Sequence, residues 1–178
     1  MAQLSDEGRN LVTKYAKKYF QQTEEMFNGG IVSVTVESDL DGYDITEVGE
    51  GIGRVVFSLP VCYVDGDDHP DGYVIKFPKA SSHNTANGKE QNQQEIEAWG
   101  NRLVDYQDKL VPIIDYHPDY WWIVMPHVNL IDTDSTEGQQ RLDELKEVGF
   151  EFEDEVELGR YNGEILLLDY GYEVKITD

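Results

Sequence analysis

The stretch "GYVIKFPK", residues 72–79, places a lysine inside an apolar segment. Val74, Ile75 and Phe77 favour β-structure, and Lys76 lies among them. The chain contains few basic residues, so an ammonium group inside a strand requires an explanation. It either reaches solvent along its aliphatic stem or faces an anion. The sequence on both sides of this stretch bears on the choice.

The segments around this stretch predict an antiparallel sheet. Each is rich in β-branched and aromatic residues, and glycine-rich or polar turns separate them. We expect strands within residues 43–51, 54–64, 73–79, 109–116 and 120–128. Towards the end of the sequence, Asn162-Gly163 predicts a tight hairpin between two further strands, because this pair readily adopts two positive φ angles.

Helical patterns flank these strands. Residues 5–27 repeat apolar side chains at helical spacing behind Ser5, a residue type that caps helices. A second helix follows the polar stretch 81–93, and a third covers residues 135–149. Residues 31–37 alternate apolar and polar side chains as a strand does. The predicted fold class is therefore α+β, with residues 1–38 as a helix-and-strand extension. Its apolar helix face packs on the sheet or, alternatively, forms an oligomer contact.

The chain is strongly acidic, with 36 Asp and Glu residues against 14 Lys and Arg residues and a net charge of −22. Such a charge repels nucleic acid and anionic membranes, so we expect neither as a partner. Because the acidic residues are spread along the whole chain, we expect a solvated surface suited to high salt. The alternative is an ordinary acidic protein with a cationic partner.

Other general features indicate the compartment. No apolar run reaches membrane-spanning length, and residues 1–10 lack the basic-then-apolar layout of a signal peptide. We therefore expect a cytoplasmic protein, with a place in a virion as the alternative. The single cysteine, Cys62, excludes a disulfide within the chain and is expected to be buried as a small hydrophobic residue.

The adjacent residues Trp121 and Trp122 belong to one predicted strand. Successive side chains of a strand point to opposite faces of the sheet. One tryptophan is therefore expected in the core. The other is expected to be covered by the N-terminal helix or by an unknown protein partner.

Four features in a fixed order suggest a phosphate site around Lys76. Three glycines occupy a turn between the first two strands of the sheet: Gly49, Gly51 and Gly53. Such a turn lets backbone N–H groups approach a phosphate closely. Glu95 lies on the following helix, where it could pair with the lysine, and Asp169 ends an apolar strand before Tyr170-Gly171. Carboxylates in such positions can bind magnesium on a nucleotide.

These features together resemble the protein-kinase-like fold. The segment 48–57 looks like its glycine-rich loop, "YVIK" (73–76) like its V-A-I-K strand, and "LLLDYGY" (166–172) like its D-F-G segment. "QNQQE" (91–95) supplies the glutamate of the helix. More narrowly, residues 44–172 resemble the short kinase-like proteins of tailed bacterial and archaeal viruses and of haloarchaea.

The resemblance implies roles for individual residues. Lys76 would hold the nucleotide phosphates, Glu95 would orient Lys76, and Asp169 would bind magnesium. The glycine turn would cover the phosphates, and residues 125–128, beginning with Met125, would form the hinge beside an adenine. The implied cofactor is ATP with magnesium. The implied architecture is a kinase-like N-lobe over residues 39–130 and a small remnant of the C-lobe over 131–178.

The resemblance fails where phosphoryl transfer needs it most. Counting back from Asp169 without a gap, the position of the second metal ligand falls on Glu157 and that of the catalytic aspartate on Phe152. Phe152 cannot accept a proton, and Asp154 reaches the position only with a two-residue shift. The sequence ends seven residues after Gly171, and Arg54 replaces the third glycine of the loop pattern.

The sequence therefore predicts a degenerate kinase-like protein of a halophile or its virus. We expect it to bind a nucleotide without phosphorylating protein. Two alternatives remain: a structural or interaction protein that keeps the fold without a ligand, and an active small kinase that uses Asp154 or Glu157.

Overall fold

The computed structural model describes residues 2–31, 33–66, 69–80, 87–153, 156–171 and 174–177. It divides into two compact units. The first comprises Met1–Gln93 and Ile113–His127, and the second comprises Gln94–Pro112 and Val128–Asp178. Helices and antiparallel sheets occur in the chain, which confirms the predicted α+β class.

The first unit is built on one five-stranded antiparallel sheet, with the strand order β2-β3-β5-β7-β6. Its helices are α1 (Asp6–Phe27), α2 (Val36–Leu40) and the beginning of α3 (Gly88–Glu97). The strands of the sheet are β2 (Glu47–Glu50), β3 (Arg54–Leu59), β5 (Tyr73–Pro78), β6 (Asp115–Tyr116) and β7 (Ile123–Pro126). A separate pair joins β1 (Gln3–Leu4) to β4 (Val64–Asp65). The predicted strands exist, but those within 109–116 and 120–128 are shorter than expected.

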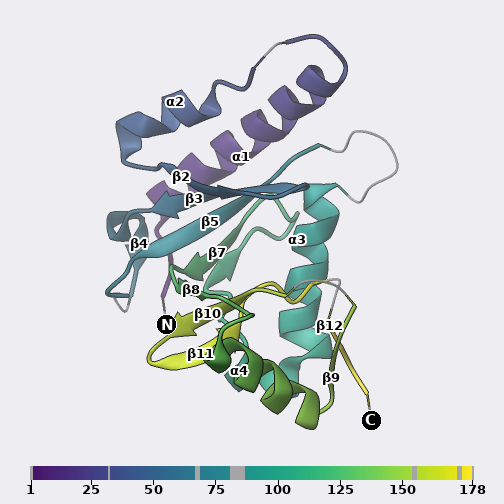
Figure 1. Cartoon of the computed structure of the whole chain (residues 1–178). Helices are drawn as coiled ribbons and strands as arrows, with labels where there is room; N and C mark the ends of the chain where they lie inside the picture. Colours follow the sequence, from purple (N-terminus) through teal and green to yellow (C-terminus); the bar gives the residue numbers. More distant parts are fainter. Residues whose placement is uncertain are drawn as a thin grey trace. The chain divides into compact units, whose positions relative to one another are not determined.

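Helices α1 and α2 cover one face of this sheet (Figure 1). Ser5 caps α1 by accepting a hydrogen bond from the Gly8 N–H, as predicted. The buried side of α1 packs against alternate residues of β3 and β5, which confirms that the N-terminal helix covers the sheet. The core residues of this face include Val12, Tyr15, Ala16, Tyr19, Val55, Phe57, Leu59, Tyr73, Ile75 and Phe77.

The predicted strand at residues 31–37 is wrong. Residues 36–40 form the short helix α2 instead, and Val32 lies outside the described residues. Val36 and Leu40, one helical turn apart, are fully buried in the core beneath α1. The Gln22 side chain bonds both the backbone and the hydroxyl of Thr35, fixing the start of α2. Burial of this pair, together with hydrogen bonds to α1, therefore outweighs the β-propensity of the valines.

The segment after β3 also differs from the prediction. Pro60 follows the last residue of β3, where its missing N–H cannot extend the ladder. A 3-10 turn then covers Val61–Tyr63 and places Cys62 on the surface. The expected burial of Cys62 is therefore wrong.

The second unit contains helix α4 and two small sheets. The elements are α4 (Thr136–Glu147), β8 (Asn129–Ile131), β9 (Phe150–Phe152), β10 (Leu158–Tyr161), β11 (Glu164–Leu167) and β12 (Val174–Ile176). The sheet orders are β11-β10-β8 and β12-β9. Beyond α3, the chain continues through a π-helical turn at Ala98–Arg102 and 3-10 turns within Val104–Lys109. Further 3-10 turns occur at Asp41–Tyr43 in the first unit.

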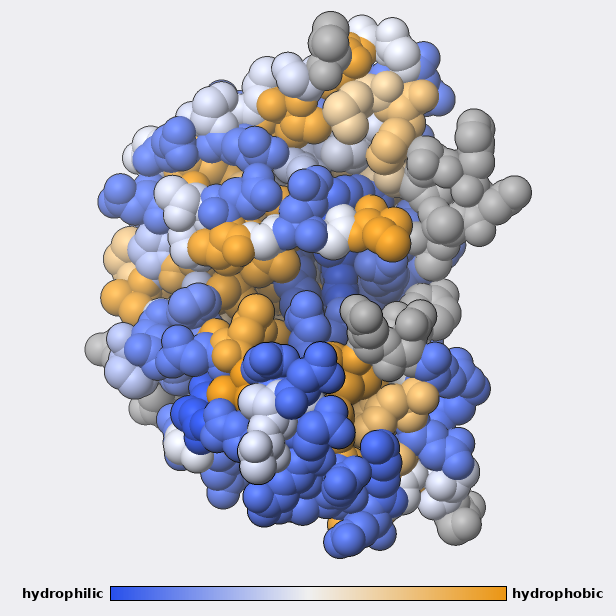
Figure 2. Space-filling view, in the orientation of Figure 1, coloured by the Kyte–Doolittle hydropathy of each residue, from blue (hydrophilic) through white to orange (hydrophobic). Residues whose placement is uncertain are grey.

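The predicted hairpin is confirmed. Asn162 and Gly163 both have positive φ, 50° and 86°, as the two-residue turn requires. Leu158 pairs with Leu167 across it, so the strands are in ungapped register. Hydrophilic residues cover much of the face shown in Figure 2, as the composition predicts. Among the described residues, no helix has both the length and the apolar composition needed to span a membrane.

Candidate functional site

Lys76 is buried in the middle of β5, with 6% of its surface exposed. It pairs with Val56 of β3 on one side and Ile123 of β7 on the other, so apolar residues flank it across the sheet. Its neighbours Ile75 and Phe77 point to the face that α1 covers, so Lys76 points to the opposite face. The ammonium group therefore does not extend into bulk water, which removes the first of the two explanations considered for it.

The glycine turn lies between β2 and β3. Gly49 belongs to β2, at an irregularity of the strand register, and the Gly51 N–H donates to the Arg54 carbonyl at 2.8 Å, which closes the turn. A Cβ at Gly53 would lie 2.4 Å from the side-chain nitrogen of Gln91. Gly53 thus permits close packing against the start of α3. Between Gly51 and Arg54, Ile52 is 89% exposed.

Lys79 fixes this turn, a role that the sequence analysis missed. Its ammonium group donates to a Glu50 carboxylate oxygen and, at 2.8 Å, to the Gly51 carbonyl. The side chain is mostly buried. The sequence does contain a signal for this role, namely the second lysine of the "KFPK" segment that also contains Lys76. The partners of Lys79, however, become neighbours only through the pairing of β2, β3 and β5.

Carboxylates gather beside the same turn. Partial removal from water raises the pKa of Glu37, and the nearby carboxylates of Glu47 and Glu50 raise it further, while Lys79 opposes the rise. The part of this shift that comes from Glu47 and Glu50 reports a negative contribution to the local field, which Lys79 opposes. A phosphate bound at the turn would experience the same field.

Within the second unit, Glu95 lies against the D-Y-G segment. Glu95 is fully buried, and a Cβ at Gly171 would lie 3.3 Å from its backbone nitrogen. The Tyr170 hydroxyl donates to the Val111 carbonyl at 3.0 Å, and its ring is fully buried. The structure therefore brings together two predicted site segments, the helix glutamate and the D-Y-G.

Arg102 holds the same segment and was also missed by the sequence analysis. Its guanidinium group donates to the Gly171 carbonyl and, at 3.2 Å, to the Val174 carbonyl. It thereby ties the π-helical turn after α3 to the chain on both sides of residues 172–173. A single arginine on a polar helix gives no sequence signal for such a role.

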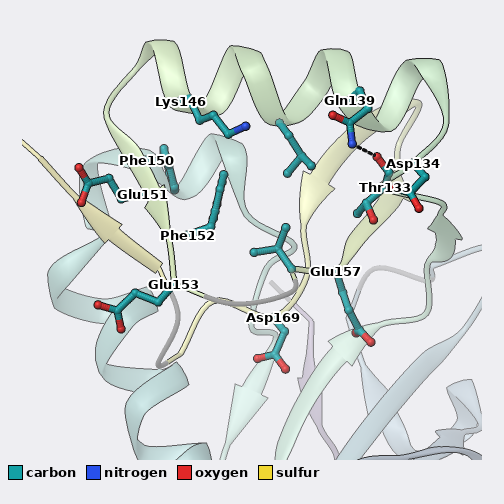
Figure 3. A pocket seen from close by; sticks show the side chains of 12 residues that line it. Thr133, Asp134, Gln139, Lys146, Phe150, Glu151, Phe152, Glu153, Glu157 and Asp169 are labelled. Atoms are coloured by element: carbon teal, nitrogen blue, oxygen red, sulfur yellow. Dashed lines mark hydrogen bonds between the residues drawn. The ribbon is translucent and has the colours of Figure 1, made fainter.

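A pocket of about 910 Å³ opens beside Asp169 in the second unit. Leu142, Phe150 and Phe152 contribute apolar walls. Figure 3 shows the Glu157 and Asp169 carboxylates at the same end of this pocket. The Leu168 N–H donates to the Glu157 carbonyl at 2.8 Å, because the hairpin register continues past Leu158 and Leu167. The hairpin is therefore ungapped, as the count back from Asp169 assumed, and the metal-binding role of Glu157 stays a prediction.

Glu157 and Asp169 both contribute a carboxylate to the lining of this pocket. Magnesium favours hard oxygen ligands and is commonly held by one or two carboxylates, with phosphates and water completing the shell. Within the described ranges, no group of three or more His, Cys, Asp or Glu residues is placed to hold a metal. The pair would therefore depend on a phosphate ligand. Asp154 lies outside the described residues, and Phe152, a pocket wall, offers no base.

The remaining predicted residues lie in the first unit or at its boundary. Met125 is fully buried in β7 and pairs with Val74 of β5. The boundary between the units falls after His127, within the predicted hinge. Lys76 belongs to the first unit and Glu95 to the second, so their pairing, like the joint role of Lys76 and Asp169, stays a prediction.

No family model matches the sequence, and no curated protein matches it.

Proposed function

We propose that this chain binds a magnesium–nucleoside triphosphate complex as a kinase-like protein and does not transfer the phosphoryl group to protein. Lys76 contacts the phosphates, Glu95 orients Lys76, and Asp169 with Glu157 holds the magnesium ion.

The observation that carries the proposal is the burial of Lys76. Removing an ammonium group from water is costly unless anions or hydrogen-bond acceptors face it. An apolar side chain at this place in β5 would pack beside Val56 and Ile123 without that cost. A lysine here is therefore best explained by acceptors on this face of the sheet, and we propose that a nucleotide phosphate adds to the contacts that Lys76 makes within the protein.

The second unit supports the magnesium part of the proposal. The Glu157 and Asp169 carboxylates lie at one end of the pocket, and two carboxylates are enough when phosphates complete the coordination. Arg102 and Tyr170 fix the chain around Asp169, so the carboxylate is presented by a well-packed segment. The lack of a proton acceptor at Phe152 argues against transfer to a hydroxyl substrate.

A second candidate function is an interaction protein that keeps this fold without a nucleotide. The glycine turn favours it, because the Gly51 N–H is already used by the Arg54 carbonyl. The carboxylates of Glu37, Glu47 and Glu50 also oppose a phosphate at this turn. In that case Lys76 is satisfied within the protein alone.

Thermal unfolding with and without ligand separates the two functions. At a nucleotide concentration about 100-fold above its Kd, binding stabilises the native state by about 2.7 kcal/mol. For a chain of this length, that corresponds to a rise in Tm of roughly 5 °C or more. We expect this rise with Mg-ATP and a smaller one when EDTA removes the magnesium.

Three variants test the named residues. Lys76→Met and Asp169→Asn should abolish the ligand-induced rise, because each removes a charge that contacts the ligand. Lys18→Met is the matched control, since it removes a lysine whose ion pair with Asp39 is exposed. An unchanged Tm for the wild-type protein at millimolar Mg-ATP would leave the interaction protein as the function.

A further inference from the structure

Most basic side chains in this acidic chain have anionic or carbonyl partners. Within the described ranges, at least eight of the 14 form ion pairs with carboxylates, and Arg102 binds carbonyls. Three lysines form no ion pair with a described carboxylate, and each lies over an aromatic ring instead: Lys14, Lys17 and Lys89. Their placement is unexpected in a chain with 36 acidic residues.

Two of these lysines share one ring. The Lys89 ammonium lies 3.9 Å from the centroid of the Trp121 ring, and that of Lys17 lies 5.7 Å from it. The Phe20 ring packs edge-on against Trp121, with centroids 5.5 Å apart. Both ammonium groups are within the range of cation–π attraction. Trp121 therefore holds two like charges, from α1 and from α3, in one place.

The turn that carries Trp121 is fixed. Tyr120 has a φ of 64°, which is unfavourable for a residue with a Cβ, and its N–H donates to the His117 carbonyl at 2.8 Å. Asn92, fully buried in α3, donates to the Tyr120 carbonyl at 3.0 Å. Trp122 is fully buried, and its indole N–H donates to the Thr13 hydroxyl at 2.8 Å. A rigid turn therefore presents Trp121.

Cationic side chains lie near His117 on two helices. Burial lowers the pKa of His117, and Lys17, Arg9 and Lys89 lower it further, while Asp119 opposes them. Arg9 is also paired with Asp115. The groups that face His117 from α1 and α3 are therefore cationic, in contrast to the chain as a whole.

We propose that Lys17 and Lys89, held over Trp121, form a docking site for an acidic segment of a partner protein. Two ammonium groups near one ring repel each other, and a carboxylate that pairs with either of them would relieve that repulsion while forming a charge-assisted hydrogen bond. Trp121 and Phe20 add apolar contact, which salt does not screen. Tryptophan is one of the residue types enriched in binding hot spots.

Charge favours a protein segment over a nucleic acid. A protein segment can carry its carboxylates only where it meets Lys17 and Lys89, so the acidic surface around these lysines repels it less. A nucleic acid extends along many phosphates and would meet the acidic surface around them, because the chain carries a net charge of −22.

The test measures binding of a fluorescein-labelled peptide by fluorescence anisotropy. The probe is a glutamate-rich peptide of about a dozen residues, compared with its glutamine counterpart and with an oligothymidylate of similar length. We expect the glutamate peptide to bind the wild-type protein, and the Lys17→Gln/Lys89→Gln variant to bind it about tenfold more weakly or worse. Trp121→Leu keeps both lysines and should also weaken binding, since it removes the ring that positions them.

The matched control is Lys109→Gln/Lys146→Gln, which makes the same charge change at two exposed ion pairs of the second unit. Its affinity for the peptide should equal that of the wild-type protein. An equal loss in both double variants would overturn the proposal, because net charge alone would then explain binding. So would tighter binding of the oligothymidylate than of the peptide, or failure of the glutamate peptide to bind better than the glutamine peptide. Unchanged melting temperatures verify that the variants are folded.

Discussion

At the scale of single residues, this chain uses its few basic side chains at defined places. The sequence predicted that Lys76 is unusual, because a lysine inside an apolar strand is visible in the sequence itself. The structure shows that it is buried. The role of Lys79 could not be predicted, since its contacts with Glu50 and Gly51 join residues 28 and 29 positions apart and depend on strand pairing.

Replacing Lys79 by methionine should destabilise the first unit. The change leaves Glu50 without its ammonium partner and removes the hydrogen bond to Gly51, so we expect a loss of about 1–3 kcal/mol. Lys18→Met in the same unit removes an exposed pair and should change the free energy of unfolding by less than about 0.5 kcal/mol. Urea unfolding measures both. Equal losses would show that Lys79 does not fix the glycine turn.

Glu37 should make stability depend on pH. Its pKa is raised above the ordinary value of 4.5 in the folded chain, so the native state is penalised as pH rises above that value. Glu37→Gln should therefore raise the Tm at neutral pH, and the gain should vanish as pH falls below about 4.5.

Glu144 provides a control of opposite sign. Hydrogen bonds from Arg141 and Gln140 hold the pKa of Glu144 below its ordinary value. Glu144→Gln should lower the Tm at neutral pH, and this cost should vanish in acid. Melting curves across this pH range measure both variants, and a Glu37→Gln gain that persisted in acid would contradict the assignment.

At the scale of elements, local signals predicted α1, α4 and the Asn162-Gly163 hairpin correctly. Each carries its own cap or turn residue, such as Ser5, so the information is local. Residues 36–40 were mispredicted because the alternating valines favour a strand until α1 and the sheet bury Val36 and Leu40. Contacts between residues distant in sequence therefore determine that residues 36–40 form a helix, which local propensity did not predict.

The docking of α3 on the sheet leads to a sharp prediction at Gly88. A Cβ at this position would lie 2.0 Å from the Gly53 carbonyl oxygen and 2.6 Å from the Pro78 Cα, and both are backbone atoms. Gly88→Ala should therefore destabilise the first unit by about 3 kcal/mol or more, although alanine favours helices.

Gly42→Ala is the matched control, because a Cβ there meets no atom within 4 Å. Gly53→Ala should fall between the two, since its nearest neighbour is the flexible end of Gln91. Denaturant unfolding ranks the three variants. A Gly88→Ala protein as stable as Gly42→Ala would mean that α3 does not begin against β3 and β5.

At the scale of the whole molecule, one part of the candidate site could be predicted from the sequence and another part could not. The order of glycine turn, lysine, glutamate and aspartate was visible in the sequence, and so was the ungapped hairpin that sets Glu157 opposite Leu168. The contacts of Arg102 and the packing of Gly171 on Glu95 were not, because they depend on the fold of residues 94–112.

The net charge of −22 predicts that salt stabilises the protein. Screening weakens the repulsion among carboxylates, and most of the gain should come as the Debye length falls from about 10 Å to about 3 Å between 0.1 M and 1 M salt. The Tm in potassium chloride should therefore rise steeply and then level off. A Tm that falls, or that does not change across this range, would contradict the prediction.

The most direct test of the central claim is a calorimetric titration of the wild-type protein with Mg-ATP. Nucleotide binding through Lys76 and Asp169 predicts saturable heat with one site per chain. It also predicts that the same titration of Lys76→Met gives only heats of dilution. Absence of binding heat in the wild-type protein up to millimolar nucleotide, or equal affinity in Lys76→Met, would contradict the claim.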